Sequence, residues 1–111
     1  MAINKVININ NTWADVRQCL SEFPLHFYPE KTIELLNTCR ANRKLRYLFP
    51  YISLGRLGLH CYEPSRFVVH DYFLCIYFYD GRYVVSTYNN ERKWFFENAG
   101  EAIGFVVDNL N

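Results

Sequence analysis

Residues 71–87, DYFLCIYFYDGRYVVST, decide the fold of this chain. Two runs rich in β-branched and aromatic residues flank the pair Asp80-Gly81. Asp-Gly readily supplies the two positive φ angles that a type I′ turn requires, and such a turn joins antiparallel strands. The stretch is therefore predicted to form a β-hairpin at the centre of a sheet.

A two-residue turn fixes which residues of the hairpin face each other. The predicted pairs are Tyr79 with Arg82, Phe78 with Tyr83, Ile76 with Val85, and Leu74 with Thr87. One face, predicted to be core, then carries Leu74, Ile76, Phe78, Tyr83, Val85 and Thr87. The opposite face carries Phe73, Cys75, Tyr77, Tyr79, Arg82, Val84, Ser86 and Tyr88. This second set is too polar for a dry interior and too aromatic for an ordinary surface, so it is either a contact surface or covered by the N-terminal segment or a second copy.

Length and composition limit what the chain can be. Its 111 residues suit a single domain over 1–111, and 50% of them are hydrophobic. That share can form a core without disulfides or metal. The formal net charge of +1 gives no long-range field for nucleic acid or an anionic membrane.

No targeting segment is recognisable in the sequence. The first residues, MAINKVININNTW, lack an apolar signal-peptide region, and no run of about 18 apolar residues occurs. We therefore expect a cytoplasmic protein without membrane association. In a reducing compartment the four cysteines, Cys19, Cys39, Cys61 and Cys75, stay free thiols.

The first half of the chain contains two predicted helices. A short strand over residues 5–10 and an N-cap at Thr12 precede a helix over about 13–22, which Pro24 ends. Pro29 begins the second helix. The inner stripe predicted for that helix consists of Ile33, Leu36, Cys39 and Arg40, with Leu35 alongside.

The connector over 24–29, PLHFYP, is expected either to cap the core or to form a contact site. Leu45 and Leu48 suggest one more helical turn before Phe49-Pro50 breaks it.

The rest of the chain adds strands and a last helix. Residues 51–62 alternate as a strand, with Gly55 and Gly58 expected to mark a turn, a bulge or a close approach. A closing strand is predicted over 93–96, followed by a helix that Asn98 caps. The predicted fold class is α+β, an antiparallel sheet of four or five strands with helices packed on one face.

No arrangement typical of catalysis or of a metal site stands out. The pairs His60-Cys61 and His70-Asp71 would point their members to opposite faces of a strand, which disfavours a shared metal. Cys75 lies in the middle of a strand, where a nucleophilic thiolate would be inaccessible. We therefore expect no cofactor, no metal and no enzymatic activity.

Two groups of residues are candidates for binding a partner. The first is on the hairpin's non-core face and consists of Tyr77, Tyr79, Arg82 and Tyr88; its aromatic and arginine side chains are those that dominate protein interfaces. The second is the basic cluster Arg43, Lys44 and Arg46, which could otherwise only complement a helix dipole. A single basic residue on the hairpin face makes nucleic acid an unlikely partner.

Four segments carry a resemblance to a known group of proteins. Residues 45–53, LRYLFPYIS, then 57–59, LGL, 80–85, DGRYVV, and 101–103, EAI, resemble a bacterial family of unknown function, loosely labelled from natural-product gene neighbourhoods. The resemblance covers about residues 40–110. His60-Cys61 departs from it, because that family often has Arg-Cys there. No catalytic residue can be transferred.

The general format is similar to that of immunity proteins from contact-dependent inhibition and polymorphic toxin systems. These are single, small, cytoplasmic domains without a catalytic motif, although those that block nucleases are often acidic. This similarity implies a protein that covers the active site of a cognate toxin domain. The alternative is an enzyme or accessory domain in small-molecule metabolism, and a homo-oligomer is possible in either case.

Overall fold

The computed structural model describes residues 13–60 and 73–110, without the side chain of His60. Within these residues the elements are α1 (Trp13–Ser21), η2 (Leu25–Phe27), α2 (Pro29–Ala41), β1 (Phe49–Ser53), β2 (Arg56–His60), β3 (Leu74–Tyr79), β4 (Arg82–Thr87), β5 (Lys93–Phe96) and α3 (Ala99–Asp108). The predictions for the strand over 5–10, Thr12, Cys61 and His70-Asp71 lie outside the described residues. None of the described helices is long and apolar enough to cross a membrane.

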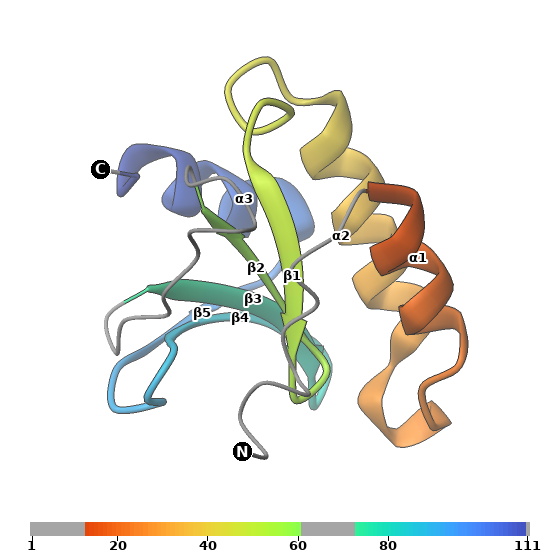
Figure 1. Ribbon diagram of the computed structural model, residues 1–111. Coiled ribbons are helices and arrows are strands. Elements are labelled where there is room, and N and C mark those ends of the chain that lie inside the picture. The colour runs from red at the N-terminus through yellow and green to blue at the C-terminus, as the bar shows by residue number, and fades with distance from the viewer. Residues whose placement is uncertain (1–12, 61–72, 111) are drawn as a thin grey trace.

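The five strands form one antiparallel sheet in the order β1-β2-β3-β4-β5 (Figure 1). Each strand therefore pairs with the next one along the chain, which is the usual arrangement of consecutive strands in an antiparallel sheet. The predicted fold class is confirmed: the chain is α+β, with a five-stranded antiparallel sheet and three α-helices among the described residues.

The central hairpin has the predicted register. Tyr79 pairs with Arg82, and the ladder continues to Leu74 and Thr87. Asp80 has a φ of 53° and Gly81 a φ of 80°, the two positive values that the Asp-Gly signal predicts. The turn type and the register were therefore both encoded locally.

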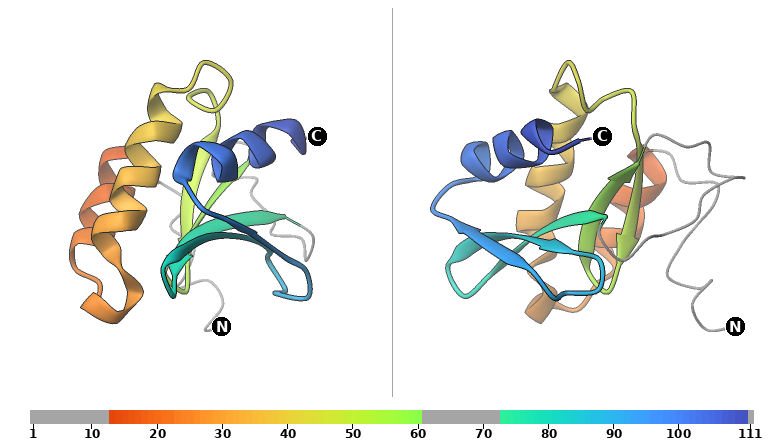
Figure 2. Two further views of the ribbon diagram at one scale, coloured as in Figure 1. Left: turned by 180° about the vertical axis from the view of Figure 1, so that it is seen from behind. Right: turned by 90° about the vertical axis from the view of Figure 1, so that its left-hand side faces the viewer.

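The helices pack against one face of the sheet, where the core lies (Figure 2). The core contains Val16 and Leu20 of α1, Leu35, Leu36 and Cys39 of α2, Ile52, Leu57, Leu59, Ile76 and Val85 of the sheet, and Ala102, Ile103 and Val106 of α3. Of the six residues on the predicted core face of the hairpin, Ile76 and Val85 belong to this cluster, and Leu74 and Tyr83 pack against it. Thr87 is buried outside the cluster, and the Phe78 ring contacts the rings of Tyr28 and Tyr83. The inner stripe of α2 needs a correction. Arg40 is exposed, and the buried stripe includes Thr32.

The helix boundaries follow the predicted signals. Pro29 is the first residue of α2, and the side-chain oxygen of Asn98 accepts a hydrogen bond from the Glu101 backbone N–H at 2.9 Å. The additional helical turn at Leu45 is instead a series of turns. Pro50 does not end a helix but lies in β1, an edge strand that tolerates the missing N–H.

The single strand predicted over 51–62 is two strands. β1 and β2 are joined by a turn at Leu54 and Gly55, which have φ angles of 53° and 80°. Among the described residues β2 pairs with β3 at two positions, Leu57 with Ile76 and Gly58 with Cys75. The hairpin of β1 and β2 consequently runs steeply across β3, β4 and β5 (Figure 1). The candidate site lies where these two parts of the sheet diverge.

Candidate functional site

The face of the sheet opposite the helices carries the residues of interest, and we call it the tyrosine face. Its residues are Tyr51 and Ser53 of β1, Arg56 and Gly58 of β2, Cys75, Tyr77 and Tyr79 of β3, Arg82, Val84 and Ser86 of β4, and Lys93 and Phe95 of β5. Part of this face is buried and part is exposed. The buried part forms a floor and the exposed part offers contact surface.

Tyr51 and Cys75 belong to the buried floor. Each is 1% exposed, and the Tyr51 hydroxyl lies 3.9 Å from the Cys75 sulfur. Burial raises the pKa of both groups above their ordinary values, because the charged forms would lose hydration. Val84 and Ser86 are also buried here. The expectation that Cys75 is inaccessible is confirmed.

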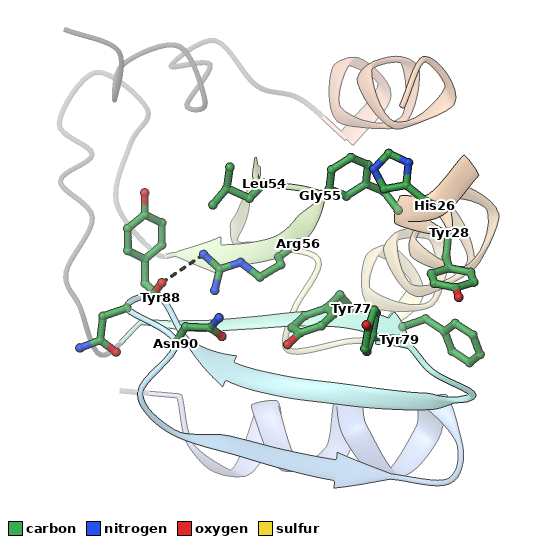
Figure 3. A pocket seen from close by; sticks show the side chains of 12 residues that line it. His26, Tyr28, Leu54, Gly55, Arg56, Tyr77, Tyr79, Tyr88 and Asn90 are labelled. Carbon is green, nitrogen blue, oxygen red and sulfur yellow. Dashed lines mark hydrogen bonds between the residues drawn. The ribbon is translucent and has the colours of Figure 1, made fainter. Parts of the chain in front are cut away.

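Arg56 crosses the sheet from β2 to the end of β4. Its Nε donates to the Ser53 carbonyl at 3.3 Å, and one terminal nitrogen donates to the Ser86 hydroxyl and the Thr87 carbonyl, each at 3.3 Å. The other terminal nitrogen donates to the Tyr88 carbonyl at 3.1 Å, the bond drawn in Figure 3. Arg56 lies on β2 and bonds to residues of β1 and β4, although β3 lies between β2 and β4. Its side chain therefore links three strands, β1, β2 and β4.

The Arg56 side chain carries a buried positive charge. The side chain is only 8% exposed, and its acceptors are carbonyls and one hydroxyl. Within the described residues no carboxylate pairs with it. Burying a charge is costly unless it is paired, although carbonyl dipoles compensate part of the loss.

Arg56 lines a pocket of about 450 Å³, shown in Figure 3 and called here the tyrosine pocket. Its lining consists of His26, Phe27, Tyr28, Leu54, Gly55, Arg56, Tyr77, Phe78, Tyr79, Tyr88, Asn89 and Asn90. These residues come from the connector before α2, the β1–β2 turn, the start of β2, β3 and the β4–β5 turn. A volume of this order is typical of small-molecule sites.

One wall of the pocket depends on a glycine. A Cβ added at Gly55 would lie 2.6 Å from Cδ1 of Phe27, so the β1–β2 turn can approach the connector only without a side chain at that position. Phe27 itself packs edge-to-face against Phe23, with ring centroids 5.5 Å apart. The predicted connector is thus mixed: Phe27 packs, while Leu25 and His26 are exposed.

The exposed part of the tyrosine face includes a patch of three residues on three adjacent strands: Tyr79, Arg82 and Phe95. Tyr79 is 62% exposed and Phe95 51% exposed. The Arg82 guanidinium lies over the Phe95 ring, with its carbon 4.5 Å from the centroid. The patch borders the tyrosine pocket, because Tyr79 belongs to both.

The predicted site residues fall into two separate places. Tyr77, Tyr79 and Tyr88 line the tyrosine pocket, and Arg82 adjoins it through its pairing with Tyr79. The basic cluster Arg43, Lys44 and Arg46 is exposed on the connection between α2 and β1. The pocket contacts the connector that precedes α2, so this helix separates the two places.

Sequence reasoning missed Arg56 and Phe95 as site residues, and it considered Tyr28 only as part of the connector over 24–29. The only available signal for Arg56 was its position one residue after the Gly55 turn. Phe95 could have been found from the alternation of the closing strand, which leaves it on the face opposite Trp94 and Phe96. Among the described residues no group of three or more His, Cys, Asp or Glu side chains could hold a metal ion.

Fold and site together define a small α+β domain with an aromatic pocket built on an antiparallel meander. The chain belongs to the family described as "Family of unknown function (DUF6193)", whose model matches residues 8–111. Neither the curated proteins nor the solved structures contain a match to this chain.

Proposed function

We propose that this chain is a cytoplasmic binding protein that recognises a protein partner through Tyr79, Arg82 and Phe95, and that the partner is a toxin domain whose active site it covers. The observation that carries the proposal is the exposed patch itself. Tyrosine and arginine concentrate binding energy at interfaces, since they bury a large area and keep a polar group.

The rigidity of the patch supports the proposal. Its three residues lie on paired central and edge strands rather than on loops, and the stack on Phe95 holds the Arg82 guanidinium in place. A preorganised surface loses less side-chain entropy on binding. The basic cluster Arg43, Lys44 and Arg46 would contribute mainly to the rate of association with an acidic partner.

A second candidate function is a role in small-molecule metabolism, as an enzyme or an accessory domain. The tyrosine pocket favours it, because a pocket of about 450 Å³ with one buried charge is larger than a flat protein interface requires. The genes beside this one separate the two functions. A neighbour encoding a secreted protein with a variable C-terminal domain favours the first, and neighbouring biosynthetic enzymes favour the second.

The direct test uses the C-terminal domain of such a secreted protein, where a neighbouring gene encodes one. Cells that express the domain should grow only when this chain is co-expressed, and the purified pair should form a 1:1 complex by calorimetry. Tyr79→Ala and Arg82→Ala should each weaken binding by about 1–3 kcal/mol while the variants stay folded. Failure to protect cells, or binding by both variants as tight as that of the parent, contradicts the proposal.

Tyr47→Ala is the matched control. Tyr47 is also a highly exposed tyrosine beside an arginine, with the Arg46 guanidinium carbon 5.1 Å from its ring centroid. It lies next to the basic cluster and not on the tyrosine face. A larger loss of affinity for Tyr47→Ala than for Tyr79→Ala would show that the partner binds at the basic cluster and not at the patch.

A further inference from the structure

We propose that the tyrosine pocket binds a small organic anion that carries an aromatic group, with the anionic end at Arg56. This site adjoins the exposed patch and shares Tyr79 with it, but the inference does not depend on a protein partner. The ligand class follows from three properties of the described residues: a buried charge, an unused hydrogen-bond donor and aromatic walls.

The positive charge of Arg56 determines that the ligand is negatively charged. Arg56 is 8% exposed, and its four hydrogen bonds go to neutral acceptors. Within residues 13–60 and 73–110 no acidic side chain neutralises it. An anion in the pocket would supply the missing counter-charge in a partly desolvated place, where electrostatic attraction is stronger than in water.

The remaining donor limits how the anion binds. A guanidinium has five N–H groups, and the four bonds to Ser53, Ser86, Thr87 and Tyr88 leave one on the nitrogen that bonds Tyr88. One oxygen of a carboxylate or a phosphate can accept it. The four existing bonds hold the guanidinium in place, so the anion would not have to order it.

The walls determine the rest of the ligand. Arg56 extends between Leu54 and Tyr77, and Tyr79 and Tyr28 lie further along the same pocket (Figure 3). Tyrosine rings bind flat aromatic groups by offset or edge-to-face contacts. The volume of about 450 Å³ accommodates a ring system together with its anionic group.

The test compares three probes of the same shape with different charge. The full chain, labelled with ¹⁵N, is titrated with 2-naphthoate, 2-naphthyl phosphate and the neutral 2-naphthamide. At least one anion should shift the amide signals of Gly55, Arg56 and Asn90 saturably and bind about 10-fold or more tightly than the amide. The two anions separate carboxylate from phosphate ligands. If neither binds more tightly than the amide, or if the shifts map elsewhere, the proposal is overturned.

Two variants test the two ends of the ligand. Arg56→Gln should abolish the preference for the anions over the amide, whereas Tyr79→Ala should lower the affinity for all three probes by a similar factor. Tyr47→Ala should bind all probes as the parent does. An Arg56→Gln protein that keeps the parent's preference overturns the proposal. If Arg56→Gln does not fold, the parent's probe comparison and its shift map decide the question alone.

Discussion

The ring of Tyr51 lies directly over Gly58. A Cβ built at Gly58 would be 2.1 Å from Cζ of that ring, a separation that no pair of real atoms of this kind tolerates. The two residues pair across β1 and β2, so the ring can lie across β2 and bring its hydroxyl to Cys75 on β3 only because position 58 has no side chain. The floor of the tyrosine face is therefore built on a glycine.

This contact predicts a large penalty for Gly58→Ala. The new methyl group must displace a fully buried ring, and overpacking of this kind costs about 1–3 kcal/mol or more. Urea denaturation measures the change. Gly104→Ala is the control, because the space around Gly104 is open and the α3 interior gains about 0.5–1 kcal/mol from alanine. Equal stability of Gly58→Ala and the parent would contradict the packing of Tyr51.

The two turn glycines should respond differently to alanine. Gly81 and Gly55 both have a φ of 80°, so each substitution places a side chain in a strained backbone conformation at a cost of about 1 kcal/mol. Nothing surrounds Gly81 within 4 Å, whereas Phe27 crowds Gly55. Gly55→Ala should thus have the lower urea midpoint of the two. The reverse order would show that the β1–β2 turn does not pack against the connector.

The part of the fold that sequence predicts well is the part encoded locally. Asp80-Gly81 specifies the turn, and the alternation of the flanking residues specifies the pairing. Asn98 and Pro29 mark their helix starts by their own chemistry. The start of β1 at Phe49-Pro50 was missed because Pro50 normally breaks regular structure, and only its edge position makes it compatible with a strand.

The pocket could not be predicted from sequence because its parts are distant along the chain. Two hydrogen-bond partners of Arg56, Ser86 and Tyr88, lie 30 and 32 positions away along the chain. No local sequence pattern indicates that β2 and the end of β4 lie close together. The alternation of residues along the hairpin was sufficient to predict Tyr77, Tyr79 and Tyr88 as site residues. Tyr28 joins them only because the connector reaches the β1–β2 turn.

The described thiols should differ strongly in reactivity. Cys19 is exposed, whereas Cys39 and Cys75 are buried. In a Cys61→Ser background, one thiol per native chain should react rapidly with a disulfide reagent, and two should react only after unfolding. Rapid reaction of two or more thiols in the native protein would contradict the burial of Cys39 or Cys75.

The reaction of Cys19 should also depend on Glu22. Burial, and secondarily the negative charge of Glu22, raise the pKa of Cys19 and reduce the thiolate fraction near neutral pH. Glu22→Gln should therefore speed the reaction at pH 7.5, while Glu30→Gln leaves it unchanged. Equal rates for the two variants would show that Glu22 does not act on this thiol.

Stability should fall at alkaline pH. Burial raises the pKa of Cys39 from its ordinary 9.0 to about 12. A group whose folded pKa is raised stabilises the fold fully below its unfolded pKa and loses that contribution as the pH rises, here between 9 and 12. The buried Tyr51 and Cys75 act in the same direction.

The measurement for this effect is the free energy of unfolding in urea between pH 8 and 11. Cys39→Ala should reduce the slope above pH 9 by up to about 1.4 kcal/mol per pH unit, the most that one proton can contribute. Cys19→Ser, at an exposed position, should change the slope much less. A slope unaffected by Cys39→Ala would exclude this thiol as a cause of alkaline unfolding.

The last prediction concerns Arg56 as a structural clamp. Arg56→Lys keeps the positive charge but replaces a planar fork by a single nitrogen, which cannot reach Ser53 and Tyr88 together with Ser86. Buried acceptors then lose their partners, at about 1–3 kcal/mol for each one left unsatisfied. Arg17→Lys, at an exposed position of α1, should change stability by no more than about 0.5 kcal/mol. Urea denaturation of both variants makes the comparison, and equal stability would mean that the bonds across β3 do not hold the sheet together, leaving charge as the reason for an arginine at position 56.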